Sequence, residues 1–193
     1  MRDAAGEGAR VRFLRKTPRA APAPVTAALI AVTGAARQPA LYGACGVPDT
    51  LDGRFDMVCL HGFLAMRRLK AIGNDESAAF SQALFDALFA DMDAALRQIG
   101  VSDLRIGKEV KKLAKAFLGR VTAYDAALSR GDDAELREAL VRNVCRGGDG
   151  GVDVDALARY TKAAAAVLAA QADDRMLAGE FPFPDPACAY DLD

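Results

Sequence analysis

Apolar residues recur at helical spacing along most of this chain, and capping and breaking residues divide the pattern into segments. Pro48-Asp49-Thr50 is typical of a helix start, and Gly73, Gly100 and Gly131 are typical of helix stops. The β-branched residues are too scattered to form strands. The pattern predicts six long helices, at 25–37, 51–72, 75–99, 103–129, 132–145 and 153–177, and a short helical turn near 41–45.

Length and composition agree with one helical domain. A single core commonly serves a chain of 193 residues, and many of the hydrophobic residues are alanine, a strong helix former. We therefore expect an all-α, single-domain helical bundle of about six helices spanning 23–180. A flexible basic leader, 1–22, is expected before the bundle, and an extended C-terminal tail, 181–193, is expected on its surface because of its closely spaced prolines.

The segment 51–72 is apolar on two opposite faces. A helix of this kind is normally buried between two layers, so we expect it to be the central helix of the bundle. Its first apolar face comprises Phe55, Cys59, Gly62, Met66 and Leu69, and the second comprises Met57, Leu60 and Leu64.

Polar side chains interrupt this helix along two narrow seams. Arg54, His61 and Arg68 follow one another at seven-residue spacing, whereas Asp56 and Arg67 lie on the other flank. Because an unpaired buried charge is costly, these groups need partners. The pattern allows two interpretations: ion pairs within the bundle, or recruitment of a partner protein.

Two aspartates of the segment 75–99 extend this charged set. Asp93 points away from the predicted core, whereas Asp91 falls at the margin of the apolar face. We expect Asp91 to pair with Arg67. A role as a catalytic acid is the alternative interpretation of Asp91, but no second catalytic group lies near Asp91 in the predicted arrangement.

The segment 103–130 has seven basic and three acidic residues, a net charge of +4, and its lysines form a stripe opposite the apolar face. The stripe comprises Lys108, Lys111, Lys112 and Lys115. It is either a solvated helix face or a docking site for an acidic surface, which could be rRNA, lipid headgroups or an acidic protein. No aromatic residues are interleaved with the lysines, which argues against base stacking, and the net charge of −1 on the whole chain gives no indication of DNA binding.

Motifs for catalysis or metal binding are missing from the sequence. His61 is the single histidine, no serine lies in a Gly-x-Ser-x-Gly turn, and the glycine-rich loop 147–151 lacks the Lys-Ser/Thr of a phosphate-binding loop. The four cysteines are widely spaced without a CxxC pair, so we expect buried thiols rather than a zinc site. We predict no enzymatic activity, no metal and no cofactor.

No apolar run approaches the roughly 20 residues of a membrane-spanning helix. The leader is rich in arginine but contains Asp3 and Glu7 and lacks the apolar core of a secretory signal. We therefore expect a cytoplasmic bacterial protein, with membrane association through the lysine stripe as an option. A mitochondrial matrix location, reached through a transit peptide, is the alternative.

Several stretches between residues 40 and 128 together resemble the ubiquinol-cytochrome c chaperone family. Gly62 and Ala90 depart from the resemblance, because bulkier or basic residues are expected there. The stretches are Gly46-Val47-Pro48-Asp49-Thr50-Leu51-Asp52-Gly53-Arg54-Phe55-Asp56-Met57, Leu60-His61, Leu64-Ala65-Met66-Arg67-Arg68-Leu69, Ala83-Leu84-Phe85-Asp86-Ala87-Leu88-Phe89-Ala90-Asp91-Met92-Asp93, Gly100-Val101-Ser102-Asp103-Leu104 and Gly107-Lys108-Glu109-Val110-Lys111-Lys112.

The resemblance implies an all-α, non-enzymatic assembly factor of the respiratory cytochrome bc complex. Mitochondrial members of the family act with a small partner protein near the ribosomal exit, and they hold newly made cytochrome b until it is hemylated and assembled. The short leader is similar to that of bacterial members, which look like stand-alone relatives. Cytochrome b is thus the implied client, and the ribosome, a membrane surface and a small partner subunit are further candidate partners.

A holding chaperone needs an exposed apolar groove with charged rims. We expect this groove beside the second apolar face of the helix 51–72, incompletely covered by the first and the last two helices. The candidate client-binding residues are Arg54, Asp56, His61, Arg67, Arg68, Asp91 and Asp93. The competing hypothesis is a peripheral lipid- or quinone-binding protein with a closed pocket lined by Phe55, Phe63, Phe85 and Phe89.

Overall fold

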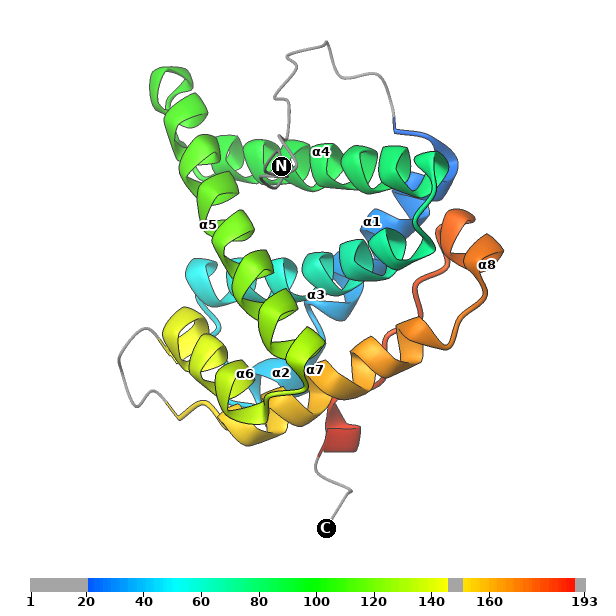
Figure 1. Ribbon diagram of the computed structural model, residues 1–193. Coiled ribbons are helices and arrows are strands. Elements are labelled where there is room, and N and C mark those ends of the chain that lie inside the picture. The colour runs from blue at the N-terminus through cyan, green and yellow to red at the C-terminus, as the bar shows by residue number, and fades with distance from the viewer. Residues whose placement is uncertain (1–20, 146–150, 190–193) are drawn as a thin grey trace, which may run out of the picture.

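The computed structural model describes residues 21–145 and 151–189, and these form an all-α bundle (Figure 1), as predicted. Most of the expected leader, most of the glycine-rich loop and the last four residues of the tail lie outside the described residues. The α-helices are α1 Ala23–Ala35, α2 Pro39–Tyr42, α3 Leu51–Ile72, α4 Asp75–Gln98, α5 Asp103–Arg130, α6 Asp133–Leu140, α7 Val154–Ala169 and α8 Asp173–Leu177. A π-helical turn, Val141–Cys145, follows α6, and a 3-10 turn spans Pro186–Ala189.

Capping groups explain where the two helices of the first hairpin begin and end. The Thr50 hydroxyl accepts a hydrogen bond of 3.1 Å from the Gly53 amide, which starts α3. Gly73 ends α3 with a φ of 76°, a left-handed conformation that glycine adopts without strain. The Asn74 side chain then accepts a hydrogen bond of 2.8 Å from the Ser77 amide, and this capping box starts α4.

The helix α3 is the central element, as its two apolar faces predicted. It contacts α1, α4, α5 and α7, and both Met57 on one face and Cys59 on the other are buried. Gly62 is the point of closest approach, since a Cβ atom there would lie 3.2 Å from both Leu88 Cδ1 on α4 and Phe117 Cε2 on α5. The small residue at this position therefore lets two helices pack against α3 at once.

The expected last helix, 153–177, is divided in two. The helix α7 ends at Ala169, and α8 begins at Asp173 after a turn. No glycine or proline lies between them. The division arises from a tertiary contact, because Arg68 of α3 binds backbone carbonyls at this turn.

The tail after α8 packs into the bundle and does not lie on its surface as expected. Phe181 is buried next to Phe80, and the Phe183 ring lies 5.1 Å from the His61 ring, measured between centroids. Gly179 has a φ of 89°, and a Cβ atom there would come within 2.1 Å of the Pro24 carbonyl oxygen. The tail therefore closes the bundle against the start of α1 and the middle of α3.

Candidate functional site

Asp56 of α3 forms a buried ion pair. Its carboxylate has an exposed fraction of 0%, and it accepts a hydrogen bond of 2.6 Å from Nη2 of Arg120, which is 12% exposed. The Arg120 guanidinium also lies over the Phe55 ring at 5.2 Å and donates to the Ala116 carbonyl oxygen at 3.2 Å. A docked partner cannot touch Asp56, so the expectation of direct client contact is corrected to a role in joining α3 to α5.

His61 is fully buried and held by hydrogen bonds at both ring nitrogens. Nδ1 lies 2.7 Å from the Met57 carbonyl oxygen and must donate its hydrogen there, so Nε2 accepts from the Tyr160 hydroxyl at 2.7 Å. Burial lowers the pKa of His61 to about 4, which keeps the ring neutral near neutral pH. This also corrects the expectation of client contact, because His61 has no surface to offer.

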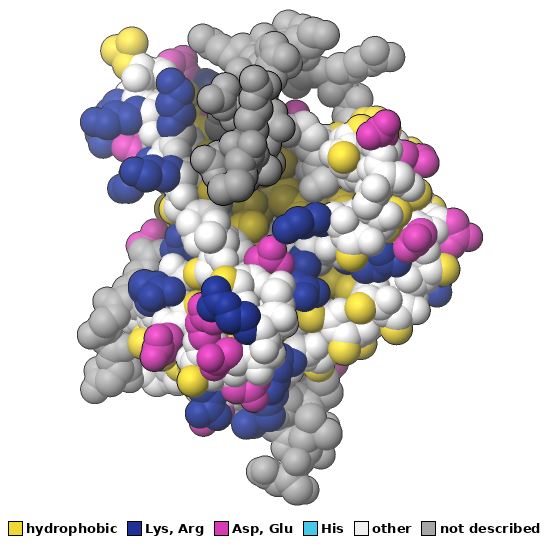
Figure 2. Space-filling model, viewed as in Figure 1, with side chains coloured by type: hydrophobic (Ala, Val, Ile, Leu, Met, Phe, Trp, Pro, Cys, Tyr) yellow, Lys and Arg dark blue, Asp and Glu magenta, His cyan; other side chains and the backbone are white. Residues whose placement is uncertain are grey.

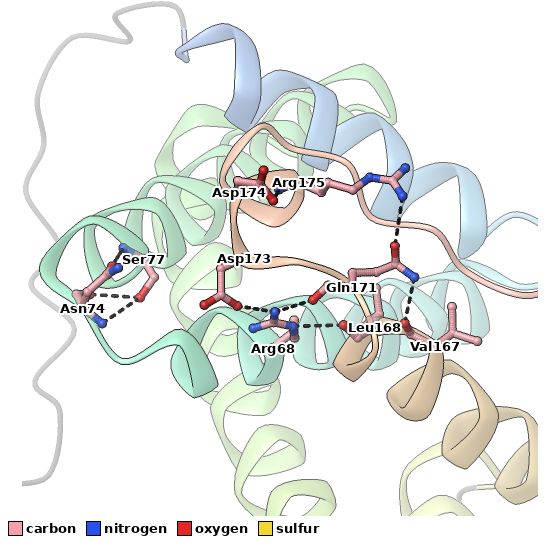
Figure 3. Close-up of polar contacts among 9 residues, drawn as sticks. All are labelled: Arg68, Asn74, Ser77, Val167, Leu168, Gln171, Asp173, Asp174 and Arg175. Carbon is pink, nitrogen blue, oxygen red and sulfur yellow. Dashed lines mark hydrogen bonds and ion pairs between the residues drawn. The ribbon is translucent and has the colours of Figure 1, made fainter.

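Arg68 connects α3 to the turn between α7 and α8 (Figure 3). Its Nε donates to the Leu168 carbonyl oxygen at 3.0 Å, and Nη2 donates to the Gln171 carbonyl oxygen at 2.7 Å and forms an ion pair with Asp173. Leu168 lies in the last turn of α7 and Gln171 just beyond its end, where carbonyl oxygens no longer have the full set of helical partners. Arg68 is buried and therefore acts mainly as a cap of α7 rather than as a client contact.

Arg67 lies on the partly exposed side of α3, but its ion-pair partner differs from the prediction. Arg67 Nε is 3.3 Å from Asp125 Oδ1 on α5, and Lys70 Nζ is 3.1 Å from Asp125 Oδ2. Asp91 is exposed on α4. The predicted pair between Asp91 and Arg67 is therefore wrong, because the crossing of α3 and α5 brings Asp125 to Arg67 instead.

The remaining candidates, Arg54 and Asp93, form surface ion pairs. Arg54 Nε donates to Asp49 Oδ1 at 2.6 Å, and this bond holds the pKa of the Asp49 carboxyl below its usual range. Arg97 bridges Asp93, at 2.7 Å, and Asp103 across the corner between α4 and α5. These pairs are accessible to a partner, unlike those of Asp56 and His61.

The four phenylalanines of the alternative ligand pocket pack against other side chains. Phe85 and Phe89 lie 4.5 Å apart between ring centroids, and the Phe63 ring is 5.7 Å from the Tyr124 ring. Phe55 is covered by Arg120. These side chains therefore fill the core around α3, and nothing in their arrangement favours the small-ligand hypothesis.

Two open hollows lie beside the exposed end of α3. One has a volume of about 270 Å³ and lies between α3, α5, α6 and α7, and the other, of about 300 Å³, lies between α3 and α7. Both are lined by Arg67 and by Ala165 and Ala169 of α7. The expected groove along Met57 and Leu60 is closed, so the accessible surface of α3 begins one to two turns later.

The lysine stripe is exposed, as its place opposite the apolar face of α5 predicted. All four lysines point to solvent in the first half of the helix, whereas Ile106 and Phe117 are buried on the opposite face. A separate hollow of about 590 Å³ adjoins Arg105 and Lys112 at the corner where α4 meets α5. Positive charge and apolar surface therefore meet at this end of the molecule.

Sequence reasoning missed the ion-pair partners of the α3 seams. Arg120, Asp125 and Asp173 supply those partners, and each lies far from α3 in the sequence. The helical period could have flagged Arg120, which follows Phe117 by three residues and falls beside the buried face of α5. No comparable signal marks Asp173, which comes after the unexpected turn.

Within 21–145 and 151–189 no helix has the length and apolar character needed to cross a bilayer. The same residues contain no group of three or more histidine, cysteine, aspartate or glutamate side chains that could hold a metal ion.

Comparison with known proteins gives three matches. The chain is 27% identical over 150 residues to Protein CBP3, mitochondrial, from Saccharomyces cerevisiae, and the match covers 75% of this chain but 44% of that protein. The chain thus spans less than half of the length of this curated relative. The fold is similar to the crystal structure of the Cbp3 homolog from Brucella abortus, with a TM-score of 0.78 and 36% identity over 86% of this chain and 91% of that one.

The third match concerns the family. The profile described as Ubiquinol-cytochrome C chaperone matches residues 43–183, which run from the turn after α2 to the buried tail. This range extends the resemblance seen in the sequence, 40–128, through α6, α7 and α8. The chain therefore belongs to the ubiquinol-cytochrome C chaperone family.

Proposed function

We propose that this protein is a non-enzymatic chaperone in the assembly of ubiquinol-cytochrome c reductase and that it holds newly made cytochrome b. The observation that carries the proposal is the family match over 43–183, supported by the shared fold with the Brucella abortus homolog. The buried polar residues of α3 fit a scaffolding role for this helix, because Asp56, His61 and Arg68 each bind groups of their own chain.

The client surface that we propose is the pair of hollows beside α3 and α7. Its floor consists of alanine side chains, Ala165 and Ala169, which allow close approach of another helix. Its rim carries Arg67, which lines both hollows, and the ion pair of Lys162 and Asp133, and these groups can bind polar groups at the end of an apolar client segment. An apolar helix of cytochrome b fits such a surface, because small residues and a charged rim suit a helix that awaits insertion.

The lysine stripe of α5 serves a separate task in this proposal. It docks the chaperone to a negatively charged surface near the place where the client is made. The four exposed lysines lie on α5, whereas the alanine floor of the hollows lies on α7. Docking and client holding therefore use different surfaces and can be lost separately.

A photo-crosslinking experiment in cells tests client holding. A photoreactive phenylalanine analogue replaces Ala169, which is exposed and lines both hollows. The matched control carries the analogue at Ala78, an exposed alanine in the first turns of α4. We expect cytochrome b in the crosslinked product of the Ala169 variant and not in that of the Ala78 variant.

Deletion of the gene gives a second, independent readout. The level of assembled ubiquinol-cytochrome c reductase should fall, while the other respiratory complexes keep their activity. Recovery of soluble metabolic enzymes alone from the Ala169 variant, together with normal reductase levels after deletion, would contradict the proposal.

A further inference from the structure

The corner between α4 and α5 exposes large apolar side chains. Leu104, in the first turn of α5, has an exposed fraction of 98%, and Ile99, just after α4, has one of 60%. Leu104 gains almost nothing from folding and Ile99 gains little, because both side chains stay mostly in water. Surface apolar residues are common singly, but two at one corner indicate a surface that another phase or molecule covers.

Basic residues surround this corner. Residues 96–116 contain six basic and two acidic side chains, a net charge of +4. One of the acidic residues, Asp103, is paired with Arg97, so the lysines and Arg105 remain as the dominant charges. Figure 2 shows hydrophobic side-chain atoms at the outermost point of this corner and dark blue Lys and Arg side chains directly below them.

The 590 Å³ hollow adds apolar surface under the same corner. Leu51 of α3, which is 60% exposed, lines it together with Leu96 and Ile99. Its charged lining residues are two cations and one anion, Arg105, Lys112 and Glu109. An amphiphile with an apolar chain and an anionic head meets matching groups here, since the apolar walls and the cations are adjacent.

We infer that this corner binds anionic bilayers, with Leu104 and Ile99 entering the lipid and the lysine stripe contacting the headgroups. Peripheral membrane proteins combine apolar insertion with basic charge in this way, and each Lys or Arg near an anionic surface strengthens binding about fivefold. An RNA surface would satisfy the lysines but would leave Leu104 in water. The inference deepens the proposed docking role of the stripe, and it does not depend on which client is held.

The absence of tryptophan from the sequence makes a direct test possible. Leu104→Trp places a single tryptophan at the corner, and Ile30→Trp places one on α1, at a side chain that is 66% exposed. Both proteins are mixed with vesicles of phosphatidylcholine, or of phosphatidylcholine and phosphatidylglycerol in equal parts. We expect a blue shift of the Leu104→Trp emission on the anionic vesicles only, quenched by lipids brominated in their acyl chains, and no change for Ile30→Trp.

Flotation of the full chain with the same vesicles separates insertion from charge. Leu104→Ser should lower the bound fraction about tenfold, and Lys108→Gln with Lys111→Gln should lower it by about fivefold for each lysine. Ile30→Ser is the control for apolar loss and should bind like the wild type. Far-ultraviolet circular dichroism checks that each variant is folded, which we expect because these side chains are exposed.

Three results would overturn the inference. The first is an equal emission shift at both tryptophan positions, which indicates non-specific adsorption. The second is binding to RNA with no binding to anionic vesicles, which assigns the stripe to a polyanion other than lipid. The third is vesicle binding that Leu104→Ser leaves unchanged. Because all three use purified components without a client, they leave the crosslinking test of client holding unaffected.

Discussion

Breaking the buried ion pair between Asp56 and Arg120 is expected to destabilise the bundle far more than breaking a surface pair of the same length. The substitution Asp56→Asn keeps the shape of the side chain and removes its charge, so the Arg120 guanidinium loses its counter-ion. Breaking a buried pair in this way typically lowers the free energy of unfolding by 3–5 kcal/mol. We expect about 3 kcal/mol, the lower end of that range, since Arg120 keeps the Ala116 carbonyl and the Phe55 ring.

The chain offers a matched control at its surface. Asp49 and Arg54 also lie 2.6 Å apart between oxygen and nitrogen, but their side chains are 56% and 61% exposed. Water and salt screen such a pair, so Asp49→Asn should leave the free energy of unfolding almost unchanged. The two pairs therefore share the same shortest distance and differ strongly in burial.

Denaturation in urea measures the free energy of unfolding of both variants, and heating measures their melting temperatures; circular dichroism follows both transitions. For a chain of this size, a loss of about 3 kcal/mol lowers the melting temperature by about 6–12 °C. The double variant Asp56→Leu with Arg120→Met should recover most of the loss, because an apolar pair avoids burying charge. A loss below about 1 kcal/mol for Asp56→Asn, or equal losses for the buried and surface variants, would refute the reasoning.

The remaining predictions concern three other positions of α3. Protonation of His61 is unfavourable in the fold, where its pKa is about 4 against 6.5 when unfolded. The stability that the neutral ring contributes is therefore full above about pH 7.5 and falls by about 2 kcal/mol by about pH 5, and urea titrations should show a flatter profile for His61→Gln. Gly62→Leu should lower the free energy of unfolding by about 2 kcal/mol through overpacking, whereas Gly107→Ala, in open space on α5, should raise it by about 0.8 kcal/mol; a similar effect at both positions contradicts the packing argument. Arg68→Met should speed amide hydrogen exchange in α8 more than in α4, and unchanged exchange in α8 would show that the cap does not hold the turn.

Local patterns in the sequence were sufficient to predict the helices around α3. Two-sided periodicity placed it in the centre, and the Pro48-Asp49-Thr50 start signal and the Gly73 stop placed its two ends within a residue. Such signals act over one or two turns, so a single sequence contains them in full. The exposure of the lysine stripe was predictable for the same reason.

Contacts between distant residues were not predictable from these patterns. Arg68 and Leu168 are 100 residues apart, and their hydrogen bond ends α7 within an alanine-rich stretch that local propensity extends further. The partner of Arg67 depends on which helix crosses α3 at that point, and periodicity gives the face of a helix but not its neighbour. For this reason the seam residues could be identified from the sequence, but their roles as client contacts or internal partners could not.

The burial of the tail has a consequence for biosynthesis. Phe181 and Phe183 cover Phe80 and His61, and Gly179 lies against Pro24 near the start of the first helix. The helices that are synthesised first, including α3 and α4, therefore keep an uncovered apolar surface until the ribosome has added Phe183 to the nascent chain. Domain completion must wait until this segment has left the exit tunnel, so the chain passes through an aggregation-prone intermediate during translation.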